Sequence, residues 1–432
     1  MKKLVSLLLA LTMIISCTAA MAAEDGKITI WTWDPNFNIA AMKVAKEMYA
    51  TINPDVEVII KEMYQADHPE VEITIEEVLS EDIETRVITA ASAGDLSNLP
   101  DIMLIQDNSA QKFVMSYPEV YTNITGKYDF EGFPAGKLAY STIDGQNYGV
   151  PFDAGTVVGT YRTDFLEQAG YTIADLTDID WDRFIEIGKD VKAKTGLPML
   201  TGQAGAVDTI LIMMQSCGTS MFNEDGSVNF TNNDKIVKVL EYYNTMVKEG
   251  IFVEVNTWDE YCGTLANSSC VGTINGCWIL GTIMGVQEHA GKWALTNMPK
   301  MPGIEGAVNY SNNGGSSWVF TQGTDLDLAL DFMQMYRNVD FYNAILPTTS
   351  AIGTWAGAKE GSNYTADNEY YGAPIFATIV EYTANVLPNQ TGAYYYDARD
   401  ALGTAVTNYL NGGDLMSELQ SAEDEVNFAM GF

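Results

Sequence analysis

Histidine is nearly absent from this chain of 432 residues, which contains only His68 and His289. Basic residues are also scarce: 23 Lys and Arg stand against 57 Asp and Glu, so the formal net charge is −34 at pH 7. A surface this acidic repels the phosphates of nucleic acids and of anionic lipids. The sequence therefore predicts neither nucleic-acid binding nor electrostatic attachment to a membrane, and it leaves little histidine for a Ser-His-Asp arrangement.

Cofactor and metal motifs are missing as well. No phosphate-binding loop of the GxxxxGK[ST] type is present, and no GxGxxG follows an expected strand. The five cysteines do not have zinc-site spacing, and neither histidine lies near Cys262, Cys270 and Cys277. We therefore expect no metal and no cofactor. For Cys217 and these three cysteines two alternatives stay open, a disulfide such as Cys262–Cys270 and free buried thiols.

The N-terminus has the composition of an export signal, which we assign to residues 1–22. A cationic start at 1–3 precedes an apolar stretch at 4–15 that is too short to span a bilayer comfortably. The phrase IISC, ending at Cys17, resembles a bacterial lipobox, whereas AMA, ending at Ala22, fits an ordinary cleavage site. We favour lipidation of Cys17, because a cysteine directly after such an apolar core is otherwise unexplained. Either route exports the protein, and a lipid would be its only attachment to the membrane.

The rest of the chain has the composition of a folded protein, with 47% hydrophobic and 19% charged residues. Apolar and β-branched runs predict strands at 27–33 and 99–105, and helical spacing predicts helices at 39–50 and 81–93. This alternation is typical of a parallel α/β sheet.

Two similar phrases at 53–60 and 68–75 each combine a turn with an alternating strand, although this position needs only one strand. One of the two phrases is therefore an edge strand or an extension of the helix. Residues 149–161 are expected to be extended, and the run NNGGSS at 312–317 is expected to be a loop. Five further helices are predicted, at 181–193, 234–248, 325–337, 397–409 and 415–428.

Aromatic and short polar residues stand where the expected strands end. Asp107 follows one strand, Trp278 follows an apolar run, and Tyr395 leads into a helix that carries Arg399. Ligands of open α/β sheets bind at the carboxyl ends of the strands. A sugar suits these residue types, because its C–H faces stack on flat rings and its hydroxyls need polar partners.

Several phrases together resemble family 1 of the extracellular solute-binding proteins. Residues 273–278 read TINGCW, which is similar to the TINGxW phrase of maltose-binding proteins, the sugar-binding subunits of ABC importers. YGVPFD at 148–153 and YRTDFLEQAG at 161–170 resemble the family's YGxP and YNKDLFEKAG phrases. GGSSW at 314–318 and YLNGG at 409–413 follow in family order.

This resemblance implies a two-lobed α/β fold of the periplasmic-binding-protein type, with interleaved lobes, a hinge and a ligand cleft between the lobes. We place one lobe at 24–152 plus 303–345 and the other at 153–302 plus 346–432. The implied function is the binding of a sugar or oligosaccharide and its delivery to a membrane permease, without catalysis. The protein is expected to act as a monomer.

The resemblance also implies the ligand site. Trp278 and Tyr395 are expected to stack on sugar rings, with Trp33 as a third platform. The side chains expected to bond hydroxyls are those of Asp34, Asp107, Asp153 and Arg399. Backbone groups near Gly314, Gly315 and Ser316 are expected to close the cleft.

The chain departs from the family at one binding position. Where maltose binders have an acid after the YGxP phrase, Gly155 stands here, with Asp153 two residues earlier, so maltose itself is not the expected ligand. Three alternatives remain at this stage. They are a ferric-ion binder using tyrosines 394–396, a secreted glycoside hydrolase, and a surface interaction protein without a small ligand.

Overall fold

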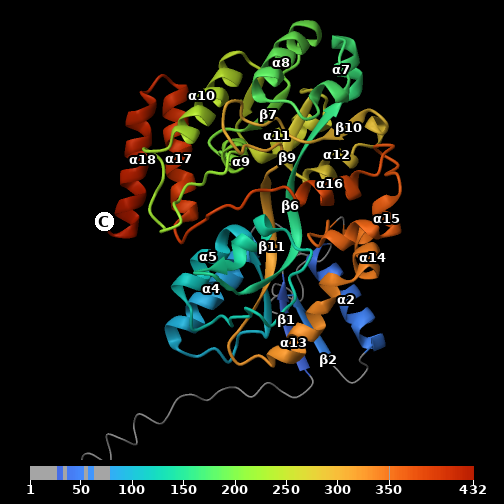
Figure 1. The fold of residues 1–432 in the computed structure, drawn as a ribbon, viewed down its shortest axis with the longest axis vertical. Helices are drawn as coiled ribbons and strands as arrows, with labels where there is room; N and C mark the ends of the chain where they lie inside the picture. Colours follow the sequence, from blue (N-terminus) through green and yellow to red (C-terminus); the bar gives the residue numbers. More distant parts are fainter. Residues whose placement is uncertain (1–26, 33–36, 53–56, 63–77, 350) are drawn as a thin grey trace, which may run out of the picture.

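The computed structural model describes residues 27–32, 37–52, 57–62, 78–349 and 351–432. Helices and strands alternate along them and gather into two parts, with β6 and β11 running from one part to the other (Figure 1). The mixed α/β fold agrees with the predicted class. Cys17, Trp33, Asp34 and the phrase at 68–75 lie outside the described residues.

The lower part in Figure 1 is built on three parallel strands, β1 (Lys27–Thr32), β2 (Glu57–Glu62) and β3 (Ile102–Gln106). The two strands predicted at 27–33 and 99–105 are thereby confirmed, and β2 overlaps the phrase at 53–60. Side chains alternate along β3, so that Leu104 joins one hydrophobic cluster and Met103 another. Both faces of this sheet are therefore covered, which explains the uninterrupted apolar run of the strand.

Helices cover the two faces of this sheet. In Figure 1, α4 (Val78–Ala93) and α5 (Asp107–Ser116) lie on one side and α2 (Asn38–Ile52) lies on the other, next to α14 (Val339–Thr349).

Strand β6 (Gly149–Arg162) is 14 residues long and buried along its whole length. Its first half pairs with β11 (Asn312–Phe320) in antiparallel register. Its second half pairs with β9 (Gly272–Gly276) and β10 (Trp293–Thr296). The sheets of the two parts therefore share one continuous strand.

The upper part in Figure 1 also contains a two-stranded parallel sheet of β7 (Leu200–Gln203) and β8 (Phe252–Val255). The helices predicted at 181–193 and 234–248 are confirmed as α8 (Trp181–Thr195) and α10 (Asp234–Lys248). Each begins at a capping side chain that accepts backbone N–H groups, as amphipathic helices commonly do.

The helices near the C-terminus are confirmed as α17 (Tyr395–Leu410) and α18 (Leu415–Met430). The segment predicted to be helical at 325–337 is α13 (Leu326–Phe332) continued by the 3₁₀ turn η4 (Met333–Arg337). The other elements are α6 (Ala135–Leu138), η1 (Ala139–Ser141), β4 (Thr142–Ile143), β5 (Gln146–Asn147), α7 (Thr163–Ala169), η2 (Ile173–Leu176), α9 (Asp208–Ser216), α11 (Trp258–Ala266), α12 (Ile279–Met284), η3 (Gln287–His289), η5 (Ala356–Glu360), α15 (Ser362–Thr365) and α16 (Ile375–Thr383).

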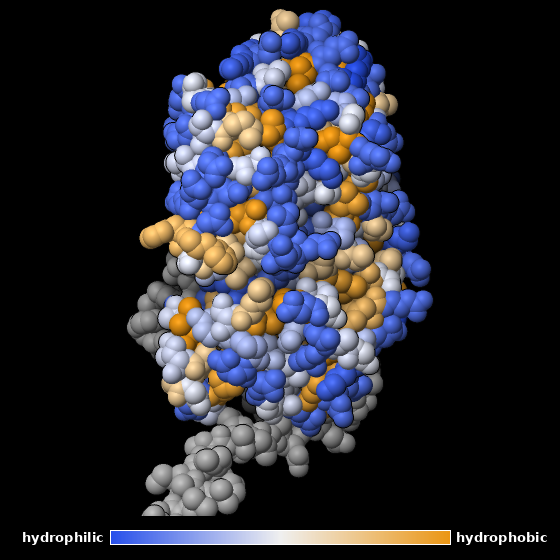
Figure 2. All heavy atoms as spheres, turned by 60° about the vertical axis from the view of Figure 1, so that its left-hand side comes forward, coloured by the Kyte–Doolittle hydropathy of each residue, from blue (hydrophilic) through white to orange (hydrophobic). Residues whose placement is uncertain are grey.

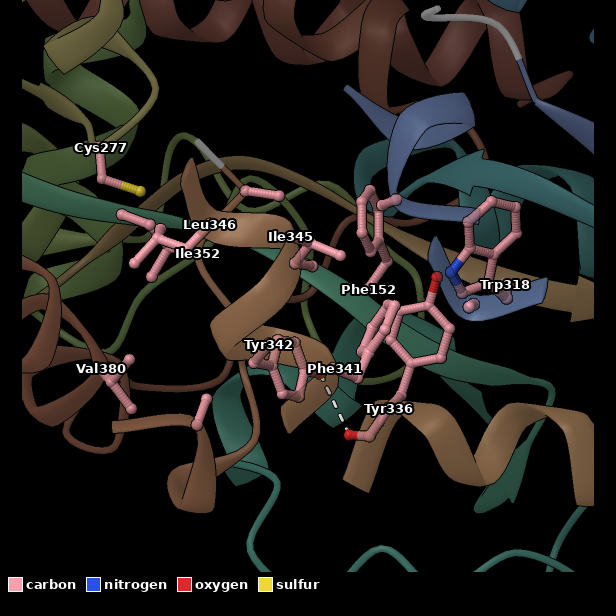
Figure 3. Close-up of a cluster of buried hydrophobic side chains, with 14 of the residues drawn as sticks. Phe152, Cys277, Trp318, Tyr336, Phe341, Tyr342, Ile345, Leu346, Ile352 and Val380 are labelled. Carbon is pink, nitrogen blue, oxygen red and sulfur yellow. Dashed lines mark hydrogen bonds between the residues drawn. The ribbon is translucent and has the colours of Figure 1, made fainter. Parts of the chain in front are cut away.

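A group of large buried aromatic side chains lies around Trp318 of β11. Its ring centroid is 5.6 Å from that of Phe152 on β6 and 6.2 Å from that of Tyr336. Figure 3 shows this aromatic group together with Tyr342, whose hydroxyl donates to the carbonyl of Tyr336 at 3.1 Å. Aromatic side chains thus fill the part of the core beside the β6–β11 pair.

The structure corrects the loop predicted at 312–317. These residues begin strand β11, whose register is shifted where it passes Gly315 and Ser316. Gly314 and Gly315 have φ of +90° and +101°, a conformation that glycine adopts without strain. The glycines therefore form an irregularity inside a strand, because pairing with both β3 and β6 outweighs the local turn composition.

All four described cysteines are free thiols, so the disulfide alternative is wrong for this structure. Cys217, Cys270 and Cys277 are buried, and burial raises the pKa of the Cys277 thiol to about 12. They pack as small apolar side chains.

The surface seen in Figure 2 is mainly hydrophilic, with small separate hydrophobic areas. No helix among the described residues is both long and apolar enough to cross a membrane.

Candidate ligand-binding site

Trp278 follows β9 and occupies the N-cap of α12, where its side chain is 41% exposed. Its indole Nε1 donates to the backbone carbonyl of Asn313 on β11 at 2.8 Å. A Cβ at position 276 would overlap this indole, so Gly276 is required for the ring's position. Trp278 is thus an exposed aromatic plate with a fixed orientation, held where β9 approaches β11.

The irregular segment of β11 connects this plate to a buried charge cluster. A Cβ on Gly314 would lie 3.3 Å from the Trp278 Nε1, and a Cβ on Gly315 would lie 2.7 Å from the Oδ2 of Asp107. Asn313 also donates through Nδ2 to the Oδ1 of Asn275 at 2.9 Å. The backbone therefore passes between the indole and the carboxylate with no room for a side chain at Gly315.

The charge cluster consists of Asp107, Asp153 and Lys137, and all three side chains are buried. Lys137 Nζ forms an ion pair with Asp107 and donates to the backbone carbonyl of Ser316 at 2.8 Å. The second oxygen of Asp107 accepts from Ser317 Oγ at 2.9 Å. The chain itself therefore supplies bonding partners for both Asp107 oxygens.

Asp153 lies on β6 and accepts a hydrogen bond from the hydroxyl of Ser316. Burial raises the pKa of Asp107 to about 6 against the opposing effect of Lys137, and burial also raises the pKa of Asp153. The single ammonium group of Lys137 thus balances the charge of only one of the two carboxylates. The cluster therefore has a net charge of −1 when Asp107, Asp153 and Lys137 are all ionised. The predicted contacts of Asp107 and Asp153 with ligand hydroxyls stay predictions.

Tyr395 and Arg399 lie on α17, in the upper part of Figure 1. The Tyr395 ring is buried, and its centroid is 5.2 Å from that of Tyr396, with the planes at 88°. Arg399 forms an ion pair with Asp208 at 2.8 Å and donates to the carbonyl of Ala206. Both residues therefore contact their own part of the molecule.

Polar bonds join α17 and the segment before it to the end of β3 and to α5. Tyr396 donates its hydroxyl to Gln106 Oε1 at 3.1 Å, and Gln111 Oε1 accepts from the backbone N–H of Gly392 at 2.6 Å. Since Gln106 and Gln111 belong to the lower part of Figure 1, these bonds cross between the two parts.

A pocket opens in the upper part between β7, α9 and α11. Its polar lining includes Gln203, Asp208, Thr209 and Asn275, and its aromatic lining includes Trp258. Such a mixture of flat rings and convergent polar groups is suited to a small polar ligand.

The predicted residues thus fall into two groups. The structure brings together Asp107, Asp153, Gly315 and Ser316, with Gly314 linking them to Trp278, whereas Tyr395 and Arg399 lie with Asp208. Sequence reasoning missed Lys137, Asn313 and Trp258. Lys137 stands in the phrase FPAGKL, where nothing in the local pattern marks a buried lysine.

The alternative of a ferric-ion site is poorly supported by this geometry. Among the described residues, no group of three or more His, Cys, Asp and Glu side chains is placed to hold a metal. Burial also raises the pKa of Tyr395 far above its usual value, which disfavours the phenolate that a ferric ion would require.

Comparisons with known proteins agree with one another. A sequence profile described as bacterial extracellular solute-binding protein matches residues 60–372. The chain is 39% identical over 410 residues to a lactose-binding protein of Rhizobium radiobacter, covering 94% of this chain and 92% of that protein. It is 24% identical over 293 residues to an arabinooligosaccharide-binding protein of Bacillus subtilis (strain 168), covering 64% of this chain and 66% of that protein.

The fold matches that of solved sugar-binding proteins. The sugar-binding protein MalE of Xanthomonas citri superposes with a TM-score of 0.76 and 16% sequence identity, covering 94% of this chain and 97% of that one. This likeness confirms the predicted two-part binding-protein architecture.

Proposed function

Because the chain belongs to the bacterial extracellular solute-binding protein family, we propose that it binds a sugar outside the cytoplasm and delivers it to the permease of an ABC importer. The proposed site includes Trp278, and it lies between the two parts of the molecule. The limits of the two lobes, 24–152 plus 303–345 and 153–302 plus 346–432, are part of this proposal.

The exposed indole of Trp278 is the observation that carries the proposal. Large aromatic rings are ordinarily buried, but Trp278 is 41% exposed. Asn313 and Gly276 nevertheless hold its ring in a single orientation. Aromatic faces of this kind stack on the C–H faces of sugars, and nearby amide, hydroxyl and carboxylate groups bond the hydroxyls.

The names of two relatives suggest lactose and arabinooligosaccharides as the ligands for a first screen. We propose a neutral saccharide of this kind as the ligand. In this proposal Asp107, Asp153 and Lys137 hold the irregular β11 segment near Trp278. Arg399, with Tyr395 on the same helix, holds Asp208 at the polar pocket.

The proposal includes no catalysis. A binding protein needs no nucleophile or proton donor aimed at a glycosidic bond, and the buried Asp107 and Asp153 are engaged by Lys137, Ser316 and Ser317. A chromogenic galactoside or arabinoside should remain intact with the purified protein, and turnover that a Trp278→Ala variant lacks would instead indicate a hydrolase.

We further propose that residues 1–22 direct export and that Cys17 carries a lipid. Metabolic labelling with a radioactive fatty acid tests this: label should enter the wild type and not Cys17→Ser. Cleavage after Ala22 would instead give an unlabelled protein whose N-terminus begins at Ala23.

Titration calorimetry with lactose, an α-1,5-arabinooligosaccharide and maltose tests the central proposal. A ligand present at 100 times its dissociation constant should also add about 2.7 kcal/mol to the stability, which a thermal shift detects. Absence of any heat or shift with every saccharide of a broad panel would overturn the proposed function.

A further inference from the structure

Trp258, at the start of α11, lies beside Trp278, and we infer that the two indoles form one platform for a saccharide of at least two units. The ring centroids are 5.5 Å apart, and the ring planes are inclined at 47°. Each side chain is 41% exposed. This inference rests on the proposed function and specifies the size of its ligand.

Two adjacent exposed indoles form an apolar surface on a protein that buries most of its large aromatic side chains. Among the described residues, Trp258 and Trp278 are the tryptophans with large exposed fractions, and they come from separate elements of the chain. Apolar area gathered at one place on a largely hydrophilic surface is typical of a binding site.

Trp258 packs on a buried group of polar and aromatic side chains. Its ring packs on Tyr261 with centroids 5.1 Å apart. The Tyr261 hydroxyl lies 2.5 Å from Thr273 Oγ1 and accepts from Asn275 Nδ2 at 3.1 Å. The position of Trp258 is therefore set before any ligand arrives, which lowers the entropic cost of binding.

The polar pocket lies at the Trp258 end of the two-indole platform. Trp258 forms part of the wall of this pocket together with Gln203, Thr209 and Asn275, whereas Trp278 does not. A sugar ring stacked on Trp278 therefore places its neighbour over Trp258, with the hydroxyls of that neighbour toward the pocket. A monosaccharide covers one indole only and leaves the other exposed.

The test compares disaccharides with their component monosaccharides on wild type and on Trp258→Ala. The probes are lactose with galactose and glucose, and α-1,5-arabinobiose with arabinose, each titrated by calorimetry. We expect Trp258→Ala to lower the affinity for the disaccharide by roughly tenfold or more. Monosaccharide affinity should change by less than about twofold or stay too weak to measure in both proteins.

Two further variants keep the result interpretable. Phe428→Ala removes an exposed aromatic ring from α18, where Phe428 is 82% exposed, and should leave all affinities and the melting temperature unchanged. Trp258→Leu keeps an apolar side chain on Tyr261 but has no flat ring, so it should reproduce the loss of disaccharide affinity even if Trp258→Ala does not fold.

Three results would overturn the inference. Unchanged disaccharide affinity in Trp258→Leu would overturn it while leaving the proposed function intact. An equal loss for disaccharide and monosaccharide would show that Trp258 acts only through the shape of the site. Absence of binding of any saccharide to the wild type would overturn the inference and the proposed function together.

Discussion

The indole nitrogen of Trp278 and the backbone carbonyl of Asn313 are joined by a 2.8 Å hydrogen bond that spans 35 positions of the sequence. This bond connects the exposed aromatic plate to the irregular segment of β11, and through Gly315 and Ser316 to the buried charges of Asp107 and Asp153.

Replacement of Trp278 by alanine should weaken saccharide binding by roughly thirtyfold or more, which corresponds to about 2 kcal/mol. The cost in stability should be small, because the side chain is already 41% exposed. Calorimetry with lactose measures the first effect and thermal unfolding the second, with Phe428→Ala as the control. Lower stability with unaltered affinity would show that Trp278 is only a structural residue.

Gly315→Ala should be more destabilising than Gly412→Ala, although both glycines have φ of +101°. The left-handed backbone alone costs an alanine about 1–2 kcal/mol, and that is the whole effect expected at position 412, where a Cβ meets no atom within 4 Å. At position 315 the Cβ would also lie 2.7 Å from Asp107 Oδ2, so we expect a total of about 3 kcal/mol or more. Urea unfolding measures the loss of stability in both variants. Equal losses would show that Asp107 moves aside for the added Cβ without an energetic cost.

Lys137→Met should destabilise the protein by about 3–5 kcal/mol near neutral pH, because it leaves Asp107 and Asp153 buried without their cation. The matched control is Lys189→Met, which removes an exposed partner of Glu249 and should cost less than about 1 kcal/mol. The difference should shrink below pH 5 as the carboxylates protonate. A loss at position 137 no larger than that of the control would contradict the tight pairing.

Asp107 should make stability fall as the pH rises. Burial raises its pKa from 3.8 to about 6 in the folded protein, so the folded state binds a proton more tightly than the unfolded chain. Its contribution is therefore fully present below about pH 4 and is lost as the pH rises through 6. Since a tenfold change in proton affinity is worth about 1.4 kcal/mol, the loss is on the order of 3 kcal/mol.

Asp107→Asn removes this titration, so the stability of the wild type relative to the variant should decrease between pH 4 and pH 6.5. Asp153 has a raised pKa for the same reason and remains in the variant, so the variant keeps a weaker slope of the same sign. Urea unfolding at a series of pH values gives both curves. A wild type that gains stability over the variant as the pH rises would contradict the assignment.

Local periodicity was sufficient to predict β1, β3 and the long helices. The continuous apolar run of β3 matches its burial on both faces, and the amphipathic pattern of α8 matches its burial on one face. Residues 312–317 were wrongly expected to form a loop, because two glycines and four short polar residues indicate a turn unless neighbouring strands pair with them. That pairing comes from β3 and β6, more than 150 positions away for each strand.

The positions of the candidate residues were predictable only where the local sequence pattern marked them. Trp278 and Asp107 were marked by their positions after apolar runs, and both lie at strand ends in the structure. Lys137 was not predictable, because an isolated lysine in a glycine-containing phrase gives no sign that two distant carboxylates surround it. Trp258 was missed for a similar reason, since only the fold places it against Trp278.

The course of β6 bears on how the molecule comes apart. Consecutive residues Val157 and Val158 point to opposite faces of the strand and belong to different hydrophobic clusters, as do Phe152 and Tyr161. Unfolding of either cluster therefore exposes one face of β6, the strand against which the other cluster packs. The chain should unfold as a single cooperative unit, with calorimetric and van't Hoff enthalpies in agreement, despite its two-part shape.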